Sequence, residues 1–151
     1  PIKGTDIADK YNVTRQVIVK DIAILRAKGF NIMATPDGYI VNRNDGKVKT
    51  IIAVKHKESE MFDEMSTVIK YGGVIEDVIV EHSLYGEIKG VLMVKNLNEL
   101  NKFIAKYSSQ EGRLLSVLTN GVHLHTISAE TSEDIEAIIS ELKAKNFIVS
   151  D

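Results

Sequence analysis

Four histidines stand out in this sequence, because histidine is the side chain that most often binds borderline divalent metals. They are His56, His82, His123 and His125. Only one residue separates His123 from His125, and side chains at positions i and i+2 of a β-strand point to the same face of the sheet. Both imidazoles are therefore placed to reach one metal ion.

Two further residues extend this candidate site. His56 ends a predicted strand, and Glu64 lies on the helix predicted to follow it, where its carboxylate can turn toward the sheet. Three nitrogens and one oxygen, without a thiolate, suit Zn(II), Ni(II) or Fe(II) and leave coordination positions open. A His-x-His pair alone more often consists of surface or hydrogen-bonded histidines. His82 lies between a strand and a turn, and we place it outside the set of metal ligands.

Length and composition exclude several classes of protein. The chain has 151 residues, of which 44% are hydrophobic and 26% charged, which is typical of one soluble domain or two small ones. The absence of cysteine excludes disulfides, thiolate metal sites and thiol catalysis. No apolar run approaches eighteen residues and no signal segment is present, so we expect a cytoplasmic protein.

The charge is unevenly distributed along the chain. Residues 1–48 hold eight basic and five acidic side chains, a balance of +3, whereas residues 49–151 hold eleven and sixteen, a balance of −5. This difference predicts that only the N-terminal part meets a polyanion such as DNA. Chance variation in surface charge is the alternative explanation.

The N-terminal part is predicted to form two helices and a hairpin. The helices span residues 4–11 and 15–28, with Thr14 as the N-cap of the second one. The Pro-Asp-Gly sequence at 36–38 lies between two apolar segments and predicts a hairpin over 31–41. The polar stretch 42–47 marks the boundary between two predicted domains, 1–46 and 47–151.

Helix, short turn, capped helix and hairpin is the order of a winged helix-turn-helix. In such a fold the second helix enters the major groove, where Arg reads guanine, Gln reads adenine and an apolar side chain touches a thymine methyl. The residues predicted to contact DNA are Thr14, Arg15, Gln16, Val19, Lys20 and Arg43. For any one of them, a place on the solvated face of an amphipathic helix is the alternative. No helix precedes Ile2, so we expect a domain without its first helix and a natural chain that begins upstream.

The remaining residues alternate between predicted strands and helices. This pattern predicts an α+β domain with a mixed sheet packed by helices. The predicted strands span 49–56, 74–82, 87–94, 121–128 and 147–149, and the predicted helices span 58–71, 97–107 and 131–145.

Two sets of segments resemble a known family. Segments 13–26 and 34–39 are similar to the DNA-binding part of the niacin-responsive transcriptional repressors of bacteria. Val80-Glu81-His82, Tyr85-Gly86 and the segment 118–127 resemble the 3H domain of that family, named for its histidines. The sequence Gly-Val-His-Leu-His-Thr-Ile at 121–127 is the most specific part of this resemblance.

The resemblance implies a DNA-binding repressor of genes for niacin uptake or NAD synthesis, with nicotinic acid as co-repressor. It also implies a homodimer and one divalent metal ion in each 3H domain. Carried over by position, the metal ligands fall on His56, Glu64, His123 and His125. We expect contacts with the effector from His82, Tyr85 and Arg113.

Three other functions fit the same residues. A His/Glu site with an open position could activate water in a metal-dependent hydrolase, although no separate general base and no His-Glu-x-x-His motif stand out. In a metal-responsive regulator the ion itself would be the signal. In a protein-interaction domain the histidines would be incidental.

Overall fold

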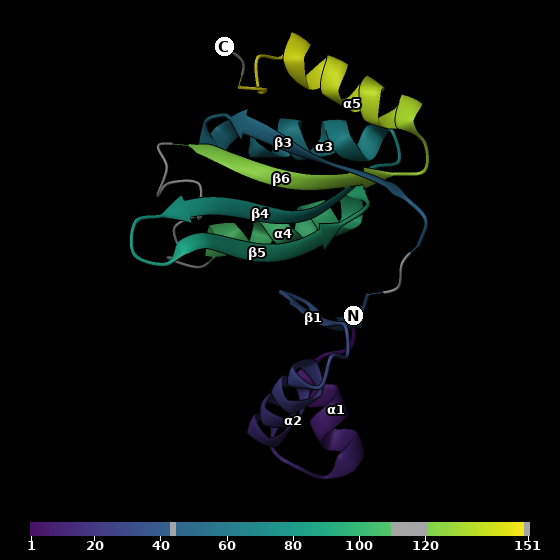
Figure 1. The fold of residues 1–151 in the computed structure, drawn as a ribbon, viewed down its shortest axis with the longest axis vertical. Helices are drawn as coiled ribbons and strands as arrows, with labels where there is room; N and C mark the ends of the chain where they lie inside the picture. Colours follow the sequence, from purple (N-terminus) through teal and green to yellow (C-terminus); the bar gives the residue numbers. More distant parts are fainter. Residues whose placement is uncertain (43–44, 110–120, 150–151) are drawn as a thin grey trace. The chain divides into compact units, whose positions relative to one another are not determined.

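The computed structural model describes residues 1–42, 45–109 and 121–149. The chain divides into two compact units, the N-terminal unit Pro1–Asp45 and the C-terminal unit Gly46–Asp151 (Figure 1). Two of the predicted site residues, Arg43 and Arg113, lie outside the described residues.

The N-terminal unit consists of the predicted two helices and hairpin. Helix α1 spans Gly4–Tyr11 and α2 spans Arg15–Ala27, while strands β1 (Ile32–Thr35) and β2 (Gly38–Val41) form the hairpin. Thr14 is the predicted N-cap of α2, and its hydroxyl accepts a hydrogen bond from the backbone N–H three residues later at 3.4 Å. The helix-turn-helix and hairpin expectations are therefore confirmed.

One glycine of the hairpin allows the chain to pass close to it. Gly38 has φ +129°, and a Cβ atom at this position would lie 2.4 Å from the carbonyl oxygen of Ile2. Ile2 exchanges two backbone hydrogen bonds of 2.9 Å with Tyr39, next to this glycine. Among the described residues of this unit, only Ala8 and Ile18 are buried hydrophobics. The N-terminal unit thus has a small core and a largely exposed surface.

The C-terminal unit alternates strands and helices. In chain order its elements are β3 (Val48–Lys55), η1 (Glu58–Glu60), α3 (Met61–Lys70), β4 (Val74–His82), β5 (Gly86–Val94), α4 (Leu97–Ser109), β6 (Val122–Ala129) and α5 (Ser132–Ala144). Most of the predicted elements are found with small shifts at their ends, although the first turn of the helix predicted from 58 is a 3-10 turn. The last predicted strand is reduced to one bridge, between Ile148 and Val54.

The four strands form one sheet in the order β3-β6-β4-β5, and every neighbouring pair is antiparallel. The predicted α+β class is therefore confirmed, but the sheet is antiparallel throughout and not mixed. Strands β3 and β4, which are linked through α3, do run in the same direction, because each is antiparallel to β6. They are not neighbours, since β6 lies between them (Figure 1).

The core of this unit lies between the sheet and its helices. It joins Ile52 of β3 and Ile127 of β6 to Met65 of α3, Leu100 of α4 and Ile138 of α5. Along β6 buried and half-buried side chains alternate from position 122 to 127, as expected for a strand with one face covered. His123 and His125 lie on the buried face, so the sheet itself carries two imidazoles into the core.

Candidate metal centre

Three elements bring the predicted metal ligands together. In the β3–β6 pair Val54 lies opposite His123 and Ile52 opposite His125. Strand β3 ends at Lys55, one residue before His56. Glu64 follows on the second turn of the helical segment, where it is 2% exposed. The two strands and the helix therefore converge on one point in the core.

The side chains of these four residues meet at short distances. Nε2 of His56 lies 2.6 Å from Oε2 of Glu64, and Nε2 of His125 lies 3.2 Å from the other carboxylate oxygen. Nε2 of His123 lies 3.1 Å from Nε2 of His125. Donor atoms of His56, Glu64 and His123 all lie within 4.8 Å of one another. The structure thus brings together all four side chains that the sequence singled out.

In each of the three histidines, the ring nitrogen that faces away from the group contacts a backbone carbonyl. The Nδ1 atoms of His56, His123 and His125 lie 2.8, 2.8 and 2.5 Å from carbonyl oxygens. The carbonyls belong to Lys57, Gly121 and Asp77, in that order. An Nδ1 atom that faces a carbonyl must donate its proton, which leaves the lone pair on Nε2. All three Nε2 lone pairs consequently point into the group.

Local structure fixes two of these carbonyls. The N–H of Lys57 donates to the carboxylate of Glu60 at 2.7 Å, which holds the start of η1 in place. Gly121 has φ +85°, and a Cβ atom there would lie 3.2 Å from the carbonyl oxygen of His56. Glycine is therefore favoured at this close approach. These carbonyls could not be predicted from the sequence, because only the folded backbone places them.

Several polar atoms of this group lack the hydrogen bonds that burial normally requires. Two Nε2 lone pairs 3.1 Å apart, on His123 and His125, cannot bond to each other without a shared proton or cation. Among the described residues, Nε2 of His56 and Oε2 of Glu64 are buried, and apart from their 2.6 Å contact with each other neither has a polar partner. A cation between these atoms would satisfy all of them, so the donor set fits a metal ion.

The electrostatics of the group depend on the carboxylate. Burial would raise the pKa of Glu64, but the neighbouring His125 and His56 lower it, so this side chain stays ionised. Burial would lower the pKa of His56 and of His125, but Glu64 outweighs burial and raises both. At His123, burial and the charge of His125 lower the pKa to about 4. His123 is therefore uncharged at neutral pH.

A hollow of about 570 Å³ adjoins this group. His123, a member of the donor group, lines it together with four apolar residues of β4 and β6. The lining residues are Ile79, Val80, Glu81, Gly86, Glu87, Val122, His123 and Leu124.

Two of the predicted effector contacts lie in the β4–β5 turn. Nδ1 of His82 accepts hydrogen bonds from the backbone N–H groups of Leu84 and Tyr85, at 3.1 and 3.3 Å. The rings of His82 and Tyr85 are 5.1 Å apart, and Tyr85 is 73% exposed. His82 therefore stabilises the turn, and a role of either residue in effector binding stays a prediction.

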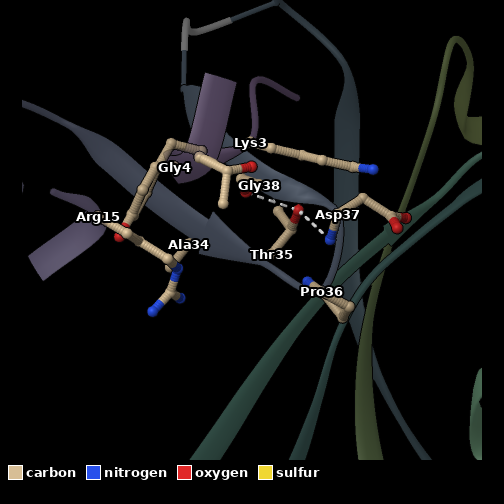
Figure 2. Close-up of a pocket in the computed structure, with 10 residues that line it drawn as sticks. Lys3, Gly4, Arg15, Ala34, Thr35, Pro36, Asp37 and Gly38 are labelled. Carbon is tan, nitrogen blue, oxygen red and sulfur yellow. Dashed lines mark hydrogen bonds between the residues drawn. The ribbon is translucent and has the colours of Figure 1, made fainter. Parts of the chain in front are cut away.

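The predicted DNA contacts within the described residues lie on one exposed side of α2. Thr14, Arg15, Gln16, Val19 and Lys20 are all exposed, whereas Ile18 between them is buried. Arg15 also lines a hollow of about 270 Å³ near the start of α1. Figure 2 shows Lys3 and Arg15 on opposite sides of the residues that line this hollow. The hydroxyl of Thr35 closes the hairpin turn by donating a 2.8 Å hydrogen bond to the carbonyl of Gly38.

Comparison with known proteins identifies the family. The model of the 3H domain matches residues 49–151, and a helix-turn-helix domain model matches residues 1–40. The chain belongs to the 3H-domain family. A protein of Thermotoga maritima named "Probable transcription repressor NiaR" is 44% identical over 151 residues, which is 100% of this chain and 86% of that protein. The "Transcription repressor NadR" of Bacillus subtilis is 34% identical over 155 residues, with the same coverage.

These relatives confirm several expectations. The resemblance to the niacin-responsive repressors is confirmed by the two domain models and by both relatives. A regulator rather than an enzyme is confirmed by the same relatives, and the hydrolase is not favoured. Within the described residues, no helix is long and apolar enough to cross a membrane.

Proposed function

We propose that this 3H-family protein represses genes for niacin uptake or NAD synthesis, with nicotinic acid as co-repressor and a divalent metal ion in the C-terminal unit. The observation that carries this proposal is the convergence of three carbonyl-anchored imidazoles and one buried carboxylate. The two repressors that match over the whole chain support the regulatory role.

The proposed ligands of the metal ion are His56, Glu64, His123 and His125. Their three nitrogens and one carboxylate suit Ni(II), Zn(II) or Fe(II), and the ionised Glu64 offsets part of the charge of a dication. A bound ion of this kind would supply a Lewis-acid site that could accept the pyridine nitrogen of nicotinate. The role of the protein is to hold the donors at fixed directions and to exclude water from them.

The hollow beside His123 is the proposed place of the nicotinate ring. Ile79, Val122 and Leu124 supply apolar contact area for an aromatic ring. Glu81 and Glu87 also line this hollow, so the carboxylate of nicotinate needs a cationic or hydrogen-bonding partner. We propose His82, Tyr85 and Arg113 for these contacts.

The N-terminal unit is proposed to bind operator DNA through α2. Arg15 and Gln16 would contact base edges, Val19 a thymine methyl group, and Lys20 a phosphate, while Thr14 and Arg43 would add contacts beside them. A homodimer, which we propose as the functional state in the cytoplasm, would present two copies of α2 about 34 Å apart to a palindromic site. Nicotinate would act as a switch by binding this arrangement more tightly than others.

Operator binding with and without each component tests this function. The DNA is taken from upstream of the organism's own genes for niacin uptake and NAD synthesis, and binding is titrated with metal-loaded and metal-stripped protein, each with and without nicotinate. We expect tight binding only when metal and nicotinate are both present. If metal alone gives full binding, the protein is a metal-responsive regulator. If stripping the metal leaves the nicotinate response unchanged, the proposed coupling is wrong.

A further inference from the structure

Asp77 is a buried carboxylate that does not belong to the donor group. It lies on β4 and is 2% exposed, within a segment of mainly apolar residues. Burial of a carboxylate is costly unless charge partners and hydrogen bonds compensate for it. The contacts of Asp77 therefore indicate the structural role of this side chain.

These contacts tie β4 to both of its neighbours. Oδ1 of Asp77 accepts a hydrogen bond from the N–H of Thr126 on β6 at 2.8 Å, and Oδ2 lies 3.1 Å from Nζ of Lys89 on β5. The main-chain carbonyl of Asp77 accepts a hydrogen bond from Nδ1 of His125 at 2.5 Å. One residue thus holds the ring of His125 and, through Thr126, the backbone next to it.

A bulge in β4 explains why a side chain, and not the backbone of β4, accepts the hydrogen bond from Thr126. Between the pairs Ile75–Ile127 and Ile79–Leu124, β4 advances four residues while β6 advances three, and a register shift also separates Ile75 from Asp77 in the pair with β5. A bulge leaves the extra residue of the bulged strand unpaired and disrupts the backbone hydrogen bonds around it. The carboxylate of Asp77 supplies the missing acceptor for Thr126, and its displaced carbonyl turns to the imidazole.

We propose that Asp77 is the positioning residue of His125. Its carboxylate fixes the bulged backbone, its carbonyl keeps the proton on Nδ1 of His125, and Nε2 is thereby directed into the donor group. This inference rests on the proposed metal site for its consequence, but the orientation of the imidazole itself does not depend on a bound ion.

Metal affinity tests the consequence. The full chain and the variants Asp77→Ala and Asp77→Asn are titrated with Ni(II) or Zn(II) by calorimetry. Asp77→Ala is expected to lose about tenfold or more in affinity, in the range seen for groups that orient metal ligands. Asp77→Asn keeps an oxygen acceptor for Thr126 and should lose less. The matched control is Glu76→Ala, which removes the neighbouring β4 carboxylate and its 3.0 Å ion pair with Lys49 but touches no ligand; its affinity should stay within about twofold of that of the unmodified chain.

The tautomer of His125 tests the orientation without metal. In ¹⁵N-histidine-labelled, metal-free protein at alkaline pH, His125 should carry its proton on Nδ1, slowly exchanging with water, and Asp77→Ala should lose that tautomer or its slow exchange. An Nε2–H tautomer in the unmodified chain overturns the proposal even if Asp77→Ala fails to fold. Equal affinity and an unchanged ring in a folded Asp77→Ala variant also overturn it. If the unmodified chain binds no metal, the proposed metal site is wrong, and the tautomer alone decides the role of Asp77.

Discussion

The N-terminal and C-terminal units place their candidate functional side chains in opposite environments. In the N-terminal unit Arg15, Gln16 and Lys20 are exposed on the first turns of α2. In the C-terminal unit His123 and His125 are each 4% exposed, inside the core of the unit. A surface site can be changed without cost to the fold, whereas a buried polar site is coupled to folding because its atoms must be satisfied in the folded state.

The largest expected effect of a substitution is the loss of the metal ion from the C-terminal unit. The double change His123→Ala and His125→Ala removes two of four proposed ligands, and we expect metal affinity to fall by more than about a hundredfold. Metal content per chain after dialysis, together with calorimetric titration, measures this loss. His82→Ala is the matched control, because that imidazole caps a turn outside the donor group. Metal retained by the double variant would show that the ion binds elsewhere.

A smaller effect is expected at the exposed site. Arg15→Ala should weaken operator binding by about 1–3 kcal/mol if its guanidinium contacts base edges, while metal content stays the same. Competition binding at fixed salt measures the loss. Arg26→Ala is the control, since Arg26 is also exposed but lies in the last turn of α2. An equal loss in both variants would mean that α2 contributes only general positive charge.

The elements of both units were predicted well because their signals are local. The Thr14 cap, the Pro-Asp-Gly turn and the apolar spacing along α2 each act within a few residues. The spacing of His123 and His125 likewise fixes their common face as soon as the segment is a strand. Selection of His56 and Glu64 as the remaining donors needed the resemblance to a family.

The strand order and the backbone carbonyls that orient the histidines could not be predicted from local signals. The insertion of β6 between β3 and β4 depends on contacts between residues far apart in the chain, and helix-linked strands alone leave it open. The carbonyls of Lys57, Gly121 and Asp77 carry no signature in their side chains. The acidic residues Glu76 and Asp77 within a mainly apolar strand are visible in the sequence, but only the bulge in the structure shows which groups Asp77 contacts.

The stability of the two units should depend on pH in different ways. The pKa values of His56 and His125 are raised in the folded state, so protonation of these side chains stabilises the metal-free fold below about pH 6.5. This contribution is lost as the pH rises through the raised pKa values. The metal-free C-terminal unit should therefore lose stability above pH 6.5, whereas the metal-loaded unit should gain it, because deprotonated ligands bind metal more tightly. Residues 1–45 contain no histidine and should show no such change.

Hydrogen exchange measured residue by residue over this pH range tests that difference. The lowered pKa of His123, about 4, acts in the opposite direction only between about pH 4 and 6.5, so the window above pH 6.5 reports on His56 and His125. A metal-free C-terminal unit whose stability rises above pH 6.5 would contradict the ionised pairing of these rings with Glu64.

The smallest expected effects come from two threonine caps that do the same task in different units. Thr131 Oγ1 accepts from the N–H of Asp134 at 3.1 Å at the start of α5, whereas Thr14 Oγ1 accepts from Val17 at 3.4 Å. Thr131→Ala should cost about 1 kcal/mol of the stability of the C-terminal unit, and Thr14→Ala less than that in the N-terminal unit, since its bond is longer. Exchange rates in each unit measure both costs, with Thr→Ser at each site as the control that keeps the acceptor. If either cap variant destabilised both units equally, the two units would fold as one. The surface site of the N-terminal unit would then depend on folding of the C-terminal unit, and the proposed difference between a surface site and a buried site would be wrong.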